Sequence, residues 1–136
     1  MMQFTVETQG HVDFITLTDQ VQAAVADSGI HDGVVTVWVG GTTAAVTVME
    51  DEEGIKKDLR ALFESWAPEN ADYEHHKRWG DRNGAAHMKS AIVGTHVCIP
   101  LAGGKLKLGR WQQILLIDFD EKPRTREITV QIVPAS

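Results

Sequence analysis

The stretch THVCIPLAGGKLKLGRWQQILLIDFDEKPRTREITVQIV, residues 95–133, decides the fold. It contains four runs rich in β-branched and other apolar residues, which are typical of strands. Gly103-Gly104 and Glu121-Lys122-Pro123 lie between runs and are turn signals. This part of the chain therefore predicts a succession of strands without a helix.

Strand patterns also occur in the first part of the chain. MQFTVET (2–8) and VDFITLT (12–18) alternate apolar and polar residues, which predicts a hairpin of half-buried strands. GVVTVWVG (33–40) is nearly all apolar, so this strand is expected to be buried on both faces. TTAAVTVM (42–49) follows it as a further strand, after Gly40 and Gly41.

Two segments show helical spacing instead. Residues 18–30 place apolar side chains on one face and end near Gly29, which suits a left-handed C-terminal stop. From Asp51 to Pro68, an apolar stripe recurs every three or four residues and is expected to face the core: Ile55, Leu59, Leu62, Phe63 and Trp66. Because the strands are more numerous and the helices do not alternate regularly with them, we expect an α+β fold. This fold is a two-layer β-sandwich of mixed or antiparallel sheets with two to three helices.

Composition limits the classes of function. A chain of 136 residues, 43% of them hydrophobic, predicts one domain spanning residues 1–136. The net charge of −6, without a basic run, argues against a nucleic-acid partner. The single cysteine, Cys98, lies in an apolar run and is expected to be buried. Because one cysteine cannot form a disulfide within the chain, a reducing compartment fits best. No signal-peptide pattern and no long apolar segment is present, so we expect a cytoplasmic protein without a membrane partner.

The stretch YEHHKRWGDRNGAAHMKS, residues 73–90, is the main candidate for chemistry, because it holds three of the six histidines. We expect His75 in a loop and His87 on a short helix that Asn83 caps. His75, Asp81 and His87 are candidate catalytic residues, and the two histidines are candidate metal ligands. Asp81 could orient an imidazole, bind a metal or act as a base. The alternative is a polar loop with a capped helix behind it, and the residues leave both interpretations open.

Two other features are weaker candidates. Thr42 and Thr43 follow two glycines, where backbone can approach a ligand closely, but ordinary strand threonines have the same pattern. His76 is expected to point away from its neighbour His75. Trp111 opens an apolar strand and is expected in the core.

The order of these segments resembles the YjbQ family, which has long been uncharacterised and is often labelled secondary thiamine-phosphate synthase. The resemblance rests on GTTAAVTVME (41–50), on H-x5-D-x-N-x3-H-x-K-S (75–90) and on G-x-L-x-L-G-x-W-Q (104–112). An R-x-R motif with a closing strand completes it.

The resemblance implies an α+β sandwich that assembles as a homotrimer, with polar clefts between subunits. These clefts would hold a divalent metal, zinc or magnesium, or an anion. The implied reaction couples a pyrimidine pyrophosphate to a thiazole phosphate with loss of pyrophosphate. The implied polar site is His75, Asp81, Asn83 and His87. Residues expected to bind the substrate or an anion are Thr42, Thr43, Asn83, Lys89, Ser90 and Arg110.

The chain departs from the family pattern at Gly41, where the family usually has a histidine, and at Arg110, where a threonine is usual. Arg110 adds a cation that could bind phosphate or pair with an acid. Two functions are therefore expected from the sequence. One is a thiamine-phosphate synthase-like transferase acting on a phosphorylated molecule. The other is a non-catalytic trimeric protein that binds a metal or an anion and has lost the histidine at position 41.

Overall fold

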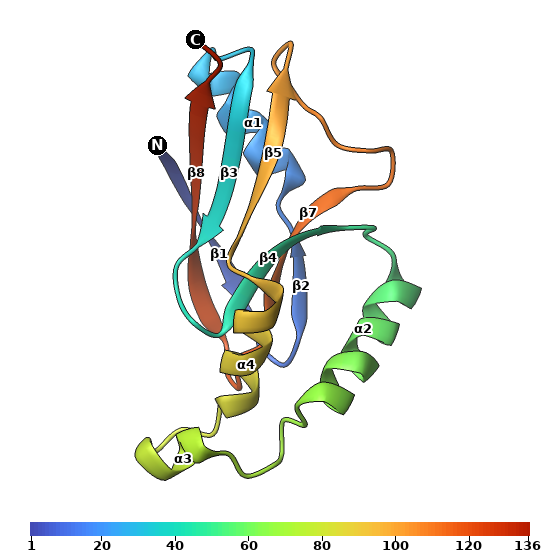
Figure 1. The fold of residues 1–136 in the computed structure, drawn as a ribbon, viewed down its shortest axis with the longest axis vertical. Coiled ribbons are helices and arrows are strands. Elements are labelled where there is room, and N and C mark those ends of the chain that lie inside the picture. Colours follow the sequence, from blue (N-terminus) through green and yellow to red (C-terminus); the bar gives the residue numbers. More distant parts are fainter.

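The computed structural model describes all of residues 1–136 as eight strands and four helices (Figure 1). The strands are β1 (Met2–Thr8), β2 (Asp13–Thr16), β3 (Gly33–Val39), β4 (Ala44–Met49), β5 (His96–Ala102), β6 (Lys105–Leu106), β7 (Gln113–Asp118) and β8 (Arg124–Pro134). The helices are α1 (Thr18–Ser28), α2 (Glu53–Trp66), α3 (Glu74–Arg78) and α4 (Gly84–Val93).

The strands form two antiparallel sheets that confirm the expected α+β sandwich. One sheet has the order β1-β8-β3-β5-β6 and the other has the order β2-β7-β4. The main core contains inward side chains of both sheets, such as Val35 and Val37 from β3 and Ile114 and Leu116 from β7. Burying these apolar side chains is the dominant favourable term that holds the layers together.

The strand buried on both faces is β7, and the expectation for β3 was wrong. Val34 and Trp38 on β3 are 44% and 46% exposed, while the intervening residues are buried or half-buried. Within the single chain nothing packs on that outer face of the larger sheet. The unbroken run from Ile114 to Ile117 is fully buried, because the main core covers one side and a second apolar cluster covers the other.

The predicted hairpin between the first two strands was also wrong. β1 pairs with β8, and β2 pairs with β7 in the other sheet. His11 and Val12 both have left-handed backbone, with φ of 55° and 63°. This turn carries the chain from one sheet to the other instead of returning it alongside β1.

The helices occupy different sides of the sandwich. Helix α1 buries Val21 and Val25 in the main core and ends at Gly29, whose φ of 71° suits the expected stop. Helix α4 packs on β4 at the opposite end (Figure 1). Helix α2 lies along the outside of the molecule, and only Phe63 is buried. Its apolar stripe is therefore largely exposed in the single chain, contrary to the sequence expectation.

Three local expectations are corrected as well. The segment around His75 is a short helix, α3, and not a loop, which brings the helices to four. Cys98 is exposed, with its Sγ 3.3 Å from Oγ1 of Thr36 on the paired strand. Trp111 is exposed and lies outside the core. None of the helices combines the length and the apolar character that crossing a membrane requires.

Candidate functional site

The structure brings His75 and His87 together. His75 lies on α3 and His87 on the first turn of α4, and the centroids of their rings are 4.5 Å apart. The loop between the two helices folds back, so the imidazoles face each other across the junction. Two imidazoles in contact can bind the same ligand, or a proton can pass from one to the other by way of that ligand.

Asp81 lies beside this pair but is held less tightly. Its Oδ1 is 3.7 Å from Nε2 of His75, which is longer than a hydrogen bond, and its side chain is about half exposed. Nε2 of His75 is nevertheless buried and has no hydrogen-bond partner in the chain. A buried polar atom without a partner costs free energy unless a ligand or water satisfies it.

His76 and Asn83 shape the site from behind. Nε2 of His76 accepts a hydrogen bond of 2.9 Å from the backbone N–H of Gly84, and Tyr73 packs edge-on against the His76 ring. His76 therefore fixes the start of α4 through Nε2, while its Nδ1 is buried without a partner. Asn83 occupies the N-cap position as expected, but its side chain makes no cap bond. Its Nδ2 instead lies 3.5 Å from Oδ1 of Asp120, and its Oδ1 is buried without a partner.

The environment of His87 favours its neutral form. Burial lowers the pKa of His87 first, and the neighbouring His75 lowers it further. Asp120, Asp81 and a hydrogen bond with the backbone of Thr42 act in the opposite direction, but the net shift of the pKa is downward. A neutral imidazole presents one N–H donor and one nitrogen acceptor, which suits proton transfer and hydrogen bonding.

His87 opens onto a hollow of about 390 Å³ between α4 and the loop that precedes β4. Its lining is mostly small or polar: Gly41, Thr42, His87, Ser90, Ala91, Gly94 and Thr95. Oγ of Ser90 donates to the carbonyl of Ala44 at 2.6 Å, so this hydroxyl holds α4 against β4. The hollow is large enough for a small polar molecule.

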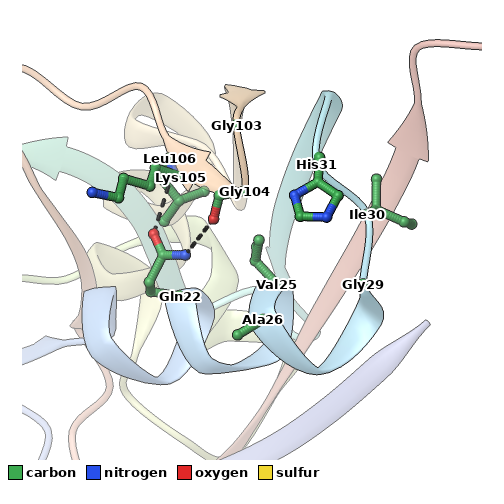
Figure 2. A pocket seen from close by; sticks show the side chains of 10 residues that line it. All are labelled: Gln22, Val25, Ala26, Gly29, Ile30, His31, Gly103, Gly104, Lys105 and Leu106. Carbon is green, nitrogen blue, oxygen red and sulfur yellow. Dashed lines mark hydrogen bonds between the residues drawn. The ribbon is translucent and has the colours of Figure 1, made fainter.

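A larger hollow of about 590 Å³ lies at the other end of the sandwich, between the end of α1 and the β5–β6 turn (Figure 2). Its best-placed polar group is already used, because Gln22 binds the carbonyl of Gly104 at 2.9 Å and the N–H of Leu106 at 3.2 Å. No second titratable group contacts His31 there. The histidine pair therefore marks the smaller hollow as the better candidate site.

Comparison with known proteins decides the family. A family model described as UPF0047 protein YjbQ-like matches residues 2–135. The chain belongs to this family.

Relatives of the YjbQ-like chain occur in archaea and bacteria. A UPF0047 protein of Archaeoglobus fulgidus is 38% identical over 96% of this chain and 98% of its own length. The UPF0047 protein YugU of Bacillus subtilis is 32% identical over 94% of this chain and 95% of its own length. The names of these relatives state no activity.

Solved structures share the YjbQ-like fold. A YbjQ-like protein of unknown function from Sulfolobus solfataricus has a TM-score of 0.92 at 30% identity, covering 98% of this chain and 95% of its own. An uncharacterised conserved YjbQ/UPF0047 protein from Clostridium acetobutylicum has a TM-score of 0.88 at 31% identity, covering 98% and 100%. The fold is therefore that of the family along the full chain.

The metal implied by the family does not fit the side chains of one YjbQ-like chain. No group of three His, Cys, Asp or Glu residues is placed to hold a metal ion. Zinc sites use three or four protein ligands, and His75 and His87 supply two. The assignment of these histidines as ligands for zinc or magnesium stays a prediction.

Three of the expected anion-binding residues lie elsewhere than the hollow. Lys89 is buried, 1% exposed, and does not line the hollow of His87. The hydroxyl of Thr43 is enclosed between Asp120 and Arg126. Arg110 stacks on Trp111 in an acidic hollow beside the far end of β4. Within one chain, Thr42 and Ser90 are thus the expected anion-binding residues that line the hollow, with Asn83 behind it.

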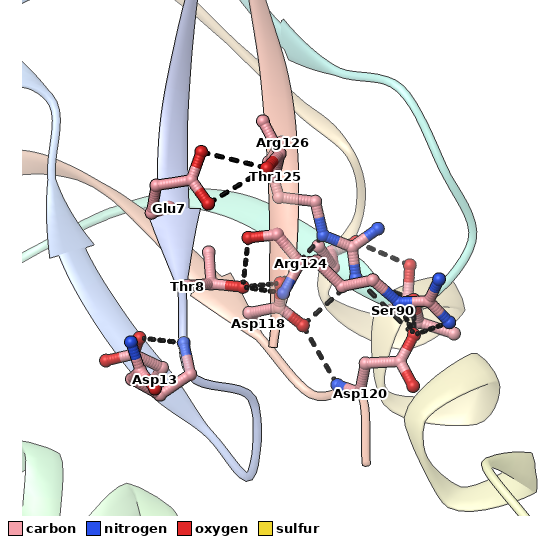
Figure 3. A network of polar contacts seen from close by, with 12 residues as sticks. Glu7, Thr8, Asp13, Ser90, Asp118, Asp120, Arg124, Thr125 and Arg126 are labelled. Carbon is pink, nitrogen blue, oxygen red and sulfur yellow. Dashed lines mark hydrogen bonds and ion pairs between the residues drawn. The ribbon is translucent and has the colours of Figure 1, made fainter. Parts of the chain in front are cut away.

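A buried charge network behind the hollow was missed by the sequence reasoning (Figure 3). Arg126 binds Asp118 through Nε at 2.7 Å and Nη2 at 3.0 Å, and Nε of Arg124 binds Asp120 at 2.9 Å. Thr8 also donates to Asp118, at 2.6 Å. The sequence pattern that could have indicated this network is a pair of acids and a pair of arginines, each at alternate positions: D-F-D at 118–120 and R-T-R at 124–126. On strands, such spacing places each pair on one face.

Proposed function

We propose that this YjbQ-like protein binds a phosphorylated small molecule in the hollow beside His87 and transfers a group from it. The observation that carries the proposal is the convergence of His75 and His87, with a buried Nε2 on His75 that lacks a partner. An imidazole N–H group at the rim of a polar hollow can donate to a phosphate oxygen, and His75 lies against His87, which lines that hollow.

The specific reaction that we propose is the one implied by the family resemblance, a thiamine-phosphate synthase-like transfer. In it, the C–O bond between a pyrimidine methylene and pyrophosphate breaks, and its electron pair leaves on pyrophosphate. The lone pair of a thiazole nitrogen then forms the new C–N bond. Hydrogen bonds from His75 and His87 would stabilise the charge that develops on the leaving group. Asp81, next to His75, would hold that imidazole in position.

A second candidate function is binding without turnover. Gly41 supports it, because a histidine usual in the family is missing from the wall of the same hollow. In that case the protein would bind a phosphorylated molecule and release no pyrophosphate.

Pyrophosphate release from the two substrates separates these candidates. We expect release by the parent protein and a loss of roughly 10²-fold or more in His75→Ala and His87→Ala, the usual scale for removing one donor that stabilises a developing charge. His31→Ala is the matched control, since His31 lies in the other hollow. Release that is equal in the parent and both site variants would contradict the catalytic proposal. Binding of phosphate without any release would favour the second candidate.

We also propose that the protein assembles as a homotrimer. The exposed apolar side chains of α2, such as Leu62 and Trp66, and the exposed Trp38 on β3 support this. Arg110, which lies away from the histidines of its own chain, could then approach those of another copy. Light scattering should give about three times the 15.0 kDa chain mass. A monomer at micromolar concentration would contradict the assembly.

A further inference from the structure

Gly41 leaves an unfilled space in the wall of the hollow beside His87. Its φ is +120°, a conformation that residues with a side chain rarely adopt. A Cβ atom built on Gly41 would lie 3.0 Å from Nη1 of Arg126, and beyond the adjoining residues no other atom lies within 4 Å. Because residue 41 has no side chain, no atom of its own covers Nη1 of Arg126 on this side, and a methyl group there would be in tight contact with the guanidinium.

Arg126 has one donor group to spare. The residue is 8% exposed and lies on β8. Its Nε and Nη2 groups donate hydrogen bonds to Asp118 on β7. Nη2 also donates to Oγ1 of Thr43 at 2.7 Å. Nη1 donates to no atom of the chain, so the group nearest Gly41 is the one without a partner. Figure 3 shows this guanidinium beside Asp118.

Backbone donors adjoin the same space. The N–H groups of Gly41 and Thr42 donate to no backbone or side-chain acceptor in the chain. Both residues line the hollow, together with His87. Main-chain donors at the wall of the hollow therefore lie close to an unpaired guanidinium donor, a set that matches the several acceptor oxygens of a phosphoryl group.

We propose that Gly41, Thr42 and Arg126 form the subsite that binds the phosphoryl group of the ligand, with Nη1 of Arg126 as its guanidinium donor. This proposal rests on the proposed function, because it names the group that the same hollow recognises. The charges of Asp118, Asp120, Arg124 and Arg126 sum to zero. Arg126 therefore contributes directed hydrogen bonds more than net positive charge, and specificity follows from the position of its donors.

The first experiment uses the parent protein and inorganic phosphate as the probe, observed by ¹⁵N NMR. We expect saturable shifts of the Gly41 and Thr42 amides and of the Arg126 guanidinium Nε–H, while Gly29 at the end of α1 stays unchanged. Saturable shifts confined to the exposed cations of α3, such as Lys77, would overturn the subsite. An absence of saturable shifts would overturn both the subsite and the phosphate-binding function.

A pair of glycine variants tests the space itself. In Gly41→Ala the new methyl group occupies the position next to Nη1, and phosphate binding should weaken about tenfold or more. Gly40→Ala is the matched control, because a Cβ on Gly40 meets no atom within 4 Å, and it should bind phosphate like the parent. Circular dichroism and thermal unfolding report whether each variant folds. The NMR titration uses the parent protein and does not depend on either variant.

His87→Ala separates failure of the subsite from failure of the proposed function. One outcome is that the parent binds phosphate, that His87→Ala binds it more weakly, and that folded Gly41→Ala and Gly40→Ala bind it equally well. The hollow is then a phosphate site, and Arg126 is not part of it. If phosphate binding weakens in Gly41→Ala and not in Gly40→Ala, the subsite is supported, whatever the outcome of the pyrophosphate-release assay.

Discussion

Arg126 and Asp118 form a two-point ion pair that joins the two sheets. Nε and Nη2 of Arg126 lie 2.7 Å and 3.0 Å from the two carboxylate oxygens of Asp118, and both side chains are buried. Arg126 belongs to β8 in the larger sheet, and Asp118 ends β7 in the smaller one. The pair thus holds the layers together directly behind the hollow that His87 lines.

Breaking this pair should be costly. In Asp118→Ala the Arg126 charge loses its main buried partner, and we expect the free energy of unfolding in urea to fall by about 3–5 kcal/mol. Glu74→Ala removes an exposed pair with Lys77 and should leave the unfolding curve nearly unchanged. Similar unfolding midpoints for the two variants would show that the buried pair does not hold the sheets together.

His87 should make stability depend on pH. Because its folded-state pKa is lowered from 6.5, the unfolded chain takes up a proton at a higher pH than the native protein does. Stability from this residue is therefore full above pH 6.5 and is lost as the pH falls below that value. Urea unfolding between about pH 5 and 8 should show this loss in the parent and less of it in His87→Gln. Asp120, whose pKa is lowered from 3.8, acts only at lower pH, so the two effects are separable. Parallel pH curves for the parent and the variant would contradict the prediction.

Lys89 should destabilise the protein near neutral pH. Burial lowers the pKa of its amine, and the charges of Glu64 and Glu69 offset only part of this shift. Lys89→Met keeps most of the side-chain volume without the charge, so its free energy of unfolding should exceed that of the parent. The parent should recover part of the difference as the pH rises toward 10.5, the ordinary pKa of lysine. Lys77→Met, at an exposed position on α3, is the control and should show neither effect. A less stable Lys89→Met would mean that the amine has a favourable partner.

Helix α2 should depend on a single anchor. Phe63 is 3% exposed and packs edge-to-face on Phe119, with ring centroids 5.0 Å apart. Phe63→Ala should lower the free energy of unfolding by about 3–5 kcal/mol, as for other buried aromatic residues. Leu62→Ala, on the exposed part of the same helix, should have a much smaller effect on the isolated chain. Equal losses in dilute, monomeric protein would show that α2 packs more closely than the contacts of Phe63 indicate.

Most of the secondary structure could be predicted from local patterns. The alternation in residues 2–8, the apolar run at 114–117 and the stop at Gly29 each depend on neighbours within a few residues. The motif at 75–90 also indicated His75 and His87, since clustered histidines are unusual. The burial of Arg126 and Asp118 was not predicted, because a charge inside a core is stable only beside a partner from a distant strand.

By itself, the sequence determined that strands dominate, where most of them lie, and that three of the six histidines fall within residues 73–90. Only the tertiary structure decided that β1 and β2 belong to different sheets, that the stripe on α2 stays largely exposed, and that Lys89 is buried outside the hollow of His87. Only it placed the guanidinium of Arg126 beside Gly41. The physical reason is that local backbone preference and hydrophobic period act over a few residues, whereas burial and ion pairing depend on which distant segments the completed fold brings into contact.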